Sequence, residues 1–199
     1  MPYAKLDADS LTVYPLSSRK NQLRLADGIC EPDGPLPEID AVLDGQLDIL
    51  VDRIIAARKN DRSVMMTYGA HLVKNKAGKV VRALIEGGWL THVATQGAGI
   101  IHDWEFSHQG ESGESVRDNA PAGKFGAWDE TGFWLNLAAI AGAVEGIGFG
   151  EAMGRLITSD GIELPEPQQL EATICAAPGD PLTAARADLL AVMRQFKLS

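Results

Sequence analysis

The chain has 199 residues, of which 45% are hydrophobic and 23% charged, as in one ordinary globular domain. Its formal net charge of −9 argues against nucleic acid and anionic membranes as partners and favours a cationic ligand such as a polyamine. No apolar run reaches the about 18 residues of a membrane span, and the amino terminus lacks the apolar core of a signal peptide, so we expect a cytoplasmic protein.

The amino-terminal part shows little regular pattern. Residues 1–37 are interpreted as an irregular arm, and residues 38–199 as one α/β domain. Apolar residues at helical spacing predict a first helix over residues 39–58. Cys30 and Cys175 have neither metal-ligand nor secreted disulfide spacing, so we expect two reduced, partly buried thiols.

A strand, a helix and a second strand follow, at residues 63–67, 77–86 and 89–95. This length suits a right-handed crossover between neighbouring parallel strands. The predicted fold class is therefore α/β, with a Rossmann-like parallel sheet and flanking helices.

The carboxyl half is predicted to be mostly helical. Helices are expected at residues 103–106, 112–119, 128–144, 149–157 and 180–196, with Ser112 or Ser115 capping the second of these. Two strands alone do not make a stable sheet. Either further weak strands exist, or the fold is incomplete and relies on a partner subunit.

A glycine-rich segment, Thr95-Gln96-Gly97-Ala98-Gly99, comes directly after the second strand. Such a segment lets backbone pass close to a phosphate, and amides at the next helix start favour negative charge. The full dinucleotide fingerprint needs a third glycine where His102 stands, so the alternative is a tight turn that binds no ligand.

Histidines and carboxylates cluster around this segment. His71 follows the first strand and His102 the second, so both are expected at one edge of the sheet, with Asp103 and Glu105 beside them. The cluster is compatible with an acid–base pair of His102 with Asp103 or Glu105, with a metal site, or with ordinary polar loop residues. Three lysines, Lys74, Lys76 and Lys79, could reach a phosphate or simply form a solvated helix start.

Two stretches carry a resemblance to a known family. Residues 68–74 read Tyr-Gly-Ala-His-Leu-Val-Lys, and residues 82–103 run from Arg-Ala-Leu-Ile-Glu-Gly-Gly-Trp to Gln-Gly-Ala-Gly-Ile-Ile-His-Asp. They resemble the deoxyhypusine synthase family, and most of all a bacterial branch of uncertain function. The similarity extends over about residues 40–160 and includes 110–117 and 123–126.

The resemblance implies a Rossmann-like fold that binds NAD, usually in a homotetramer, so a dimer or tetramer is expected here. The family enzyme oxidises spermidine with NAD and transfers its aminobutyl group to a lysine. By position, Thr95, Gln96, Gly97, Ala98 and Gly99 would line the NAD, with Gly69, Ala70 and His71 as further cofactor contacts. His102, Asp103 and Glu105 are the candidate catalytic residues, and no metal is expected.

The chain departs from the family pattern in two ways. Two glutamates that serve the amine substrate are replaced by Ile101 and His102, so a cationic amine would lose charge-assisted partners. The family's second half, with its acceptor lysine, has no counterpart, so the chain resembles an amino-terminal portion. Two alternatives follow: a non-catalytic nucleotide-binding or interaction module with a decayed active site, and a metal-dependent hydrolase.

Overall fold

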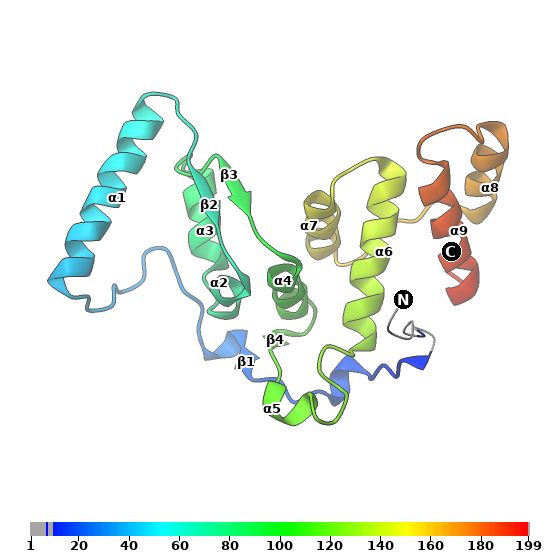
Figure 1. Ribbon diagram of the computed structural model, residues 1–199, viewed down its shortest axis with the longest axis horizontal. Coiled ribbons are helices and arrows are strands. Elements are labelled where there is room, and N and C mark those ends of the chain that lie inside the picture. Colours follow the sequence, from blue (N-terminus) through cyan, green and yellow to red (C-terminus); the bar gives the residue numbers. More distant parts are fainter. Residues whose placement is uncertain (1–6, 8–9, 199) are drawn as a thin grey trace, which may run out of the picture. The chain divides into compact units, whose positions relative to one another are not determined.

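The computed structural model describes residue 7 and residues 10–198. Its contacts divide this part of the chain into two compact units (Figure 1). One unit is Leu23–Gly113, and the other contains the described residues up to Gln22 together with those from Glu114 onward. The boundary predicted at residue 37 lies inside the first of these units and stays a prediction.

The unit Leu23–Gly113 mixes strands and helices. In chain order its elements are β1 (Leu23–Arg24), η3 (Leu25–Asp27), α1 (Ala41–Lys59), β2 (Met65–Thr67), α2 (Ala70–Lys74), α3 (Gly78–Glu86), β3 (His92–Ala94), α4 (Gly97–Gln109) and β4 (Glu111–Ser112). The predicted first helix, strand pair and crossover helix are all present with slightly shifted ends, whereas α2, β1 and β4 were not predicted.

The strands β2 and β3 form a parallel pair, as the crossover pattern predicts. Met65 pairs with His92, Met66 with Val93 and Thr67 with Ala94. Each sheet in the described part of the chain has two strands, and β1 and β4 form the other one, antiparallel. The fold is thus mixed α/β and rich in helix, and the wider Rossmann-like sheet stays a proposal.

Helix α1 begins at a cap that its sequence provides. The Asp40 carboxylate accepts a hydrogen bond of 2.8 Å from the backbone N–H of Leu43, which satisfies a first-turn donor. The helix ends in Arg58 and Lys59, where positive charge complements the helix dipole. None of its residues is buried.

Helix α4 begins earlier than the sequence suggests. The glycine-rich segment was expected to be a turn before a helix at residue 103, but Gly97, Ala98 and Gly99 already form the first turn of α4. The helix ends where Gly110 adopts a left-handed conformation with φ of 72°, and its N–H donates to the Phe106 carbonyl. The backbone amides of a helix start therefore follow closely after β3, which is important for the function considered below.

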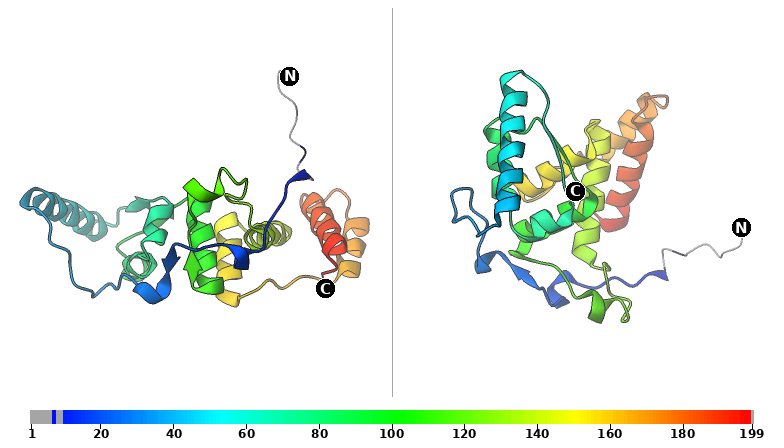
Figure 2. Two further views of the ribbon diagram at one scale, coloured as in Figure 1. Left: turned by 90° about the horizontal axis from the view of Figure 1, so that it is seen from below. Right: turned by 60° about the vertical axis from the view of Figure 1, so that its left-hand side comes forward.

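The other unit is helical. Its elements are η2 (Leu16–Ser18), α5 (Val116–Asn119), α6 (Asp129–Glu145), α7 (Phe149–Ser159), α8 (Pro167–Ala176) and α9 (Thr183–Phe196). A buried cluster of Leu137, Leu170, Leu189, Leu190 and Met193 joins α6, α8 and α9. Figure 2 shows α8 and α9 side by side.

Two helix starts differ from the prediction. The sequence predicts no helix between residues 157 and 180, yet α8 lies there, and Pro167 occupies its first turn, where a missing N–H costs nothing. Helix α9 begins at Thr183, after Asp180 rather than at it, because the Asp180 side chain accepts from the Leu182 N–H in the preceding turn.

The described residues contain no single helix that is long and apolar enough to cross a membrane. Helices α6 and α7 meet that test only together, and they are bent by 118° relative to each other.

Candidate functional site

The site begins at the carboxyl ends of β2 and β3. Tyr68 follows β2 directly, and its backbone N–H donates to the Ala94 carbonyl of β3 over 3.0 Å. Thr95 and Gln96 follow β3 and lead into α4. Because the strands are parallel and adjacent, both ends lie at the same edge of the sheet, which is where open α/β folds bind ligands.

Gly99 is required where α4 packs on α2. A Cβ atom at this position would stand 2.9 Å from the Thr95 hydroxyl and 4.0 Å from the Ala70 Cα, and Gly99 itself is buried. Gly69, the residue before α2, also lies close, because a Cβ there would stand 3.5 Å from the Gln96 side-chain nitrogen. Gly69, Ala70, Thr95, Gln96 and Gly99, which the sequence predicts as cofactor contacts, therefore lie close together.

Gly97 differs from Gly99, because a Cβ atom there would meet no atom within 4 Å. Open space therefore lies over the first residue of α4. The N-cap residue, Gln96, makes no side-chain capping hydrogen bond. The helix dipole favours an anionic group at such a helix start.

Two titratable residues, Tyr68 and Asp103, lie beside the glycines, and the Thr95 side chain hydrogen-bonds to Tyr68. Desolvation raises the pKa of the Asp103 carboxyl, although part of its side chain remains exposed. Desolvation also raises the pKa of the Tyr68 phenol; the nearby Asp103 charge adds to this effect, and a hydrogen bond with the Thr95 side chain opposes it. Asp103 and Gly99 are four residues apart, so both lie on the same face of α4.

His102 and Glu105 belong to a different cluster, centred on Ser112 of β4. The Ser112 hydroxyl donates to the Glu105 carboxylate over 2.5 Å, and Nδ1 of His102 lies 2.7 Å from the same hydroxyl oxygen. Ser112 and Glu105 are fully buried. Since the hydroxyl has one proton, which it donates to Glu105, Nδ1 of His102 donates to the Ser112 oxygen.

The structure thus divides the predicted catalytic residues. Asp103 accompanies Tyr68 at the strand ends, whereas His102 and Glu105 are joined through Ser112. Sequence reasoning missed Tyr68, although its place directly after a strand was a usable signal. It also considered Ser112 as a helix cap, but the cap of α5 is Ser115, whose hydroxyl accepts from the Asp118 N–H.

The structure also places the other residues that the sequence suggested for a site, namely His71 and the lysine cluster. His71 is exposed on α2, and no group of three or more potential metal ligands occurs among the described residues. Lys79 pairs with Glu31 at 2.5 Å, and Lys76 donates to the Arg24 carbonyl over 3.1 Å. The lysine cluster therefore serves at least in part to hold its own unit together.

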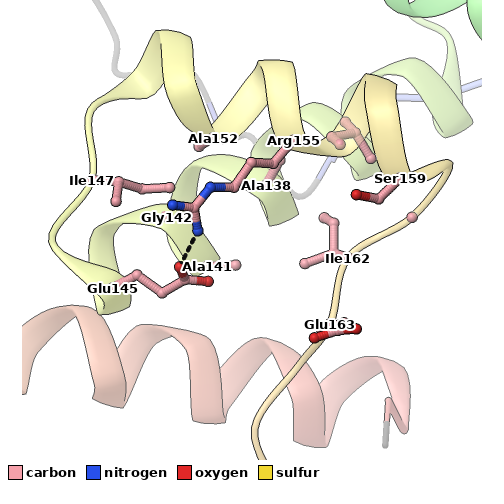
Figure 3. Close-up of a pocket in the computed structure, with 12 residues that line it drawn as sticks. Ala138, Ala141, Gly142, Glu145, Ile147, Ala152, Arg155, Ser159, Ile162 and Glu163 are labelled. Atoms are coloured by element: carbon pink, nitrogen blue, oxygen red, sulfur yellow. Dashed lines mark hydrogen bonds and ion pairs between the residues drawn. The ribbon is translucent and has the colours of Figure 1, made fainter.

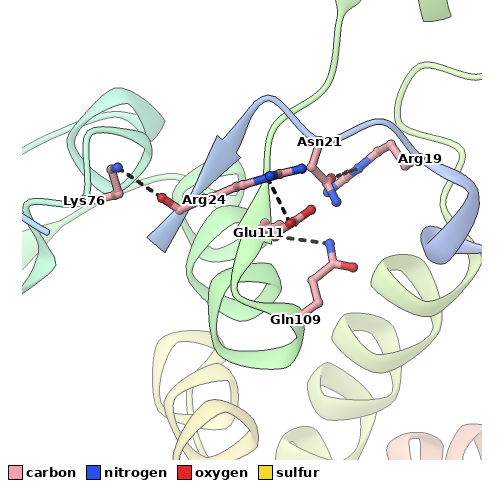
Figure 4. A network of polar contacts seen from close by, with 6 residues as sticks. All are labelled: Arg19, Asn21, Arg24, Lys76, Gln109 and Glu111. Carbon is pink, nitrogen blue, oxygen red and sulfur yellow. Dashed lines mark hydrogen bonds and ion pairs between the residues drawn. The ribbon is translucent and has the colours of Figure 1, made fainter. Parts of the chain in front are cut away.

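Polar contacts join β1 to β4 and extend to Lys76 (Figure 4). Arg24 forms an ion pair of 3.1 Å with Glu111, and the Gln109 amide donates to the Glu111 carbonyl over 3.1 Å. These contacts hold the strand that contains Ser112, and so they help to position the His102–Ser112–Glu105 cluster.

The helical unit contains a cavity of about 370 Å³ between α6, α7 and residues 161–163 (Figure 3). Arg155 spans part of it and forms ion pairs of 2.5 Å with Glu145 and 2.6 Å with Glu151. Much of the remaining lining is small and apolar, including Ala138, Ala141 and Gly142. No sequence motif predicts a site here, and the Arg155 charge is paired within the helical unit.

No known protein family, curated protein or solved structure matches this chain.

Proposed function

We propose that the unit Leu23–Gly113 binds NAD at the carboxyl ends of β2 and β3, with the dinucleotide phosphates at the start of α4. The observation that carries this proposal is the open space over Gly97, next to an uncapped helix start that follows a parallel strand. An anionic ligand there would be stabilised by backbone amides rather than by side-chain cations, which suits an acidic protein. The resemblance to deoxyhypusine-synthase-like proteins points to the same residues.

The candidate contacts have distinct roles in this proposal. Gly97 and Ala98 offer backbone amides, and Thr95, Gln96 and Gly69 shape the surface beside them. Gly99 allows α4 to approach α2, so its contribution is indirect. Ala70 and His71 begin α2 at the same edge, where His71 is exposed to a ligand.

The chemistry we propose is oxidation or transfer of an amine-bearing group, in which bound NAD would accept a hydride. Asp103 is the carboxylate that such an amine would meet, because it is partly exposed beside Tyr68. Glu105 is a poor amine contact, because it is fully buried and accepts from Ser112. We place this activity in a cytoplasmic homo-oligomer.

A second candidate, a nucleotide-binding module without turnover, is favoured by one observation. Two of the three predicted catalytic side chains, His102 and Glu105, are joined to a buried serine and so have a structural explanation. Asp103→Asn distinguishes the two: an amine-oxidising enzyme would lose NADH formation, and a binding module would show none to lose.

Binding is tested by calorimetry with NAD on the intact protein. We expect heat of binding for the unmodified chain and a loss of at least about tenfold in affinity for Gly97→Val, whose side chain would fill the space over the helix start. Gly78→Ala is the matched control, since that glycine also begins a helix and an added Cβ meets nothing within 4 Å. Equal affinity in all three proteins, or no binding by the unmodified chain, would refute the site.

A further inference from the structure

Helix α1 exposes a continuous apolar seam. Leu43, Leu47, Leu50 and Ile54 follow one another at spacings of four, three and four residues, which places them on one face. The first three are 42%, 40% and 51% exposed. Single exposed leucines are unremarkable, but a seam of them along a helix is the pattern of a helix that packs against another.

The rest of the unit covers only one part of α1. Ile54, Ile55 and Val51 line an apolar cavity of about 270 Å³ with Leu84, Trp89 and Leu90. This contact involves the carboxyl-terminal half of the helix, so Leu43 and Leu47 remain outside it. Isolated helices of this length are marginal in water, and most of their stability comes from packing an apolar face.

Charge is distributed unevenly along the same helix. Asp40 and the residues Asp44, Asp48 and Asp52 make the first two thirds acidic, whereas Arg53, Arg58 and Lys59 make the end basic. Asp44 and Arg58 are two heptads apart and therefore flank the seam on the same side. Arg58 is held in place by its donation to the Gly88 carbonyl over 2.8 Å.

The charge pattern of α1 is complementary to that of a second α1 helix that runs in the opposite direction. In an antiparallel pair related by a two-fold axis near Leu50, Asp44 of each helix would face Arg58 of the other, and the two helix dipoles would oppose each other favourably. A parallel pair would instead bring the acidic parts together. The seam is also close to symmetric about Leu50, because Leu43 and Ala57 each lie seven residues from it.

We propose that the partner of α1 is a second copy of this chain, and that two α1 helices pack antiparallel through Leu43, Leu47, Leu50 and Ile54. The interface is independent of nucleotide binding, so it is measured without NAD. It gives the homo-oligomer proposed above a defined surface and orientation.

Disulfide cross-linking tests the orientation. Cys30 and Cys175 are exposed and free, so both are first replaced by serine. In this background Leu50→Cys should cross-link to itself across the two-fold axis under mild oxidation. Leu43→Cys should not cross-link alone, but it should cross-link when mixed with Ala57→Cys. Self-cross-linking of Leu43→Cys would indicate a parallel pair and overturn the proposal.

Sedimentation velocity tests the surface itself. The unmodified chain should be a dimer, and Leu47→Glu should raise the dimer dissociation constant at least about tenfold. Val42→Glu is the matched control, because Val42 lies on the same helix outside the seam and is 73% exposed. A monomeric unmodified chain, or equal effects of the two substitutions, would overturn the proposal.

The charge pairing is tested separately, with Asp44→Lys compared with Asp44→Glu. The lysine variant should dissociate more readily and the glutamate variant should not, and both should keep the helical circular dichroism of the unmodified chain. Unchanged dimerisation of Asp44→Lys would contradict the antiparallel charge pairing.

Discussion

The two units of the molecule differ in how far they bury their apolar side chains. In the helical unit, α6, α8 and α9 enclose a shared cluster, and Leu189 has no exposed surface. In the unit Leu23–Gly113, α1 buries no residue, and Met65 of β2 is 62% exposed. The helical unit therefore encloses a shared apolar cluster, whereas α1 leaves most of its large apolar side chains exposed.

Buried polar groups also contribute to the unit Leu23–Gly113. The unit Leu23–Gly113 buries Glu105 and Ser112 completely and satisfies them with each other. A buried carboxylate is costly unless it is hydrogen-bonded. This unit thus depends on a specific polar arrangement, in addition to a rather small set of buried apolar residues.

The largest predicted effect is in the helical core. Leu189→Ala should lower the free energy of unfolding by about 2–5 kcal/mol, because it leaves a cavity in a closely packed cluster. Urea denaturation followed by circular dichroism measures this loss. Val42→Ala in α1 is the control, because Val42 is 73% exposed and lies outside the seam, and it should change the free energy of unfolding by less than about 0.5 kcal/mol. Similar losses in both variants would remove the contrast between the units.

A smaller effect is predicted for the buried serine. Ser112→Ala should lower stability by about 1–3 kcal/mol, because it leaves the Glu105 carboxylate without a buried donor that it now has. Thermal unfolding of this variant and of Ser115→Ala measures the difference. Ser115 caps only the short helix α5, so its loss should be nearer about 1 kcal/mol. An equal or larger loss for Ser115→Ala would show that the buried cluster is not important for stability.

The sequence predicted the elements whose signals are local. The parallel pair and its crossover helix were predicted from short apolar runs, and α1 was predicted from helical periodicity. Helix α8 was missed because Pro165 and Pro167 look like loop residues, although proline is well suited to a first helical turn. The expected partial burial of Cys30 and Cys175 was wrong, since both are exposed.

The candidate site was less accessible to sequence reasoning. The glycine-rich segment follows β3, as the sequence predicts, but it was expected to be a turn, and the helix that begins at Gly97 was placed six residues too late. Residues two positions apart in a helix do not share a face, so the predicted helix over residues 103–106 already places Asp103 and Glu105 on different sides. The contact of Glu105 with Ser112 joins a helix to a short strand, and no local pattern encodes such a contact.

The smallest predicted effect concerns the titratable groups at the strand ends, where the two units differ again. In the helical unit the Arg155 guanidinium lies between two carboxylates, whereas Asp103 is partly desolvated beside the Tyr68 phenol. Asp103→Asn removes a nearby negative charge, so the pKa of Tyr68 should fall but stay above its usual range, because desolvation is the larger cause. Thr95→Ala should raise the pKa of Tyr68 further, since its hydrogen bond lowers it.

Absorbance of the phenolate during an alkaline titration measures these shifts, with Tyr68→Phe identifying the relevant tyrosine among three.

The Asp103 carboxyl also predicts how stability depends on pH in the acid range, with a definite sign. Its pKa is raised on folding, so the folded protein holds the proton more tightly and stability falls as pH rises from about 3.8 through the folded-state value. Asp103→Asn should therefore be more stable than the unmodified chain at neutral pH and equal to it below that window. If Asp103→Asn were less stable than the unmodified chain at neutral pH, the fold would stabilise the ionised Asp103 carboxylate. The strand ends would then attract cations strongly enough to outweigh desolvation.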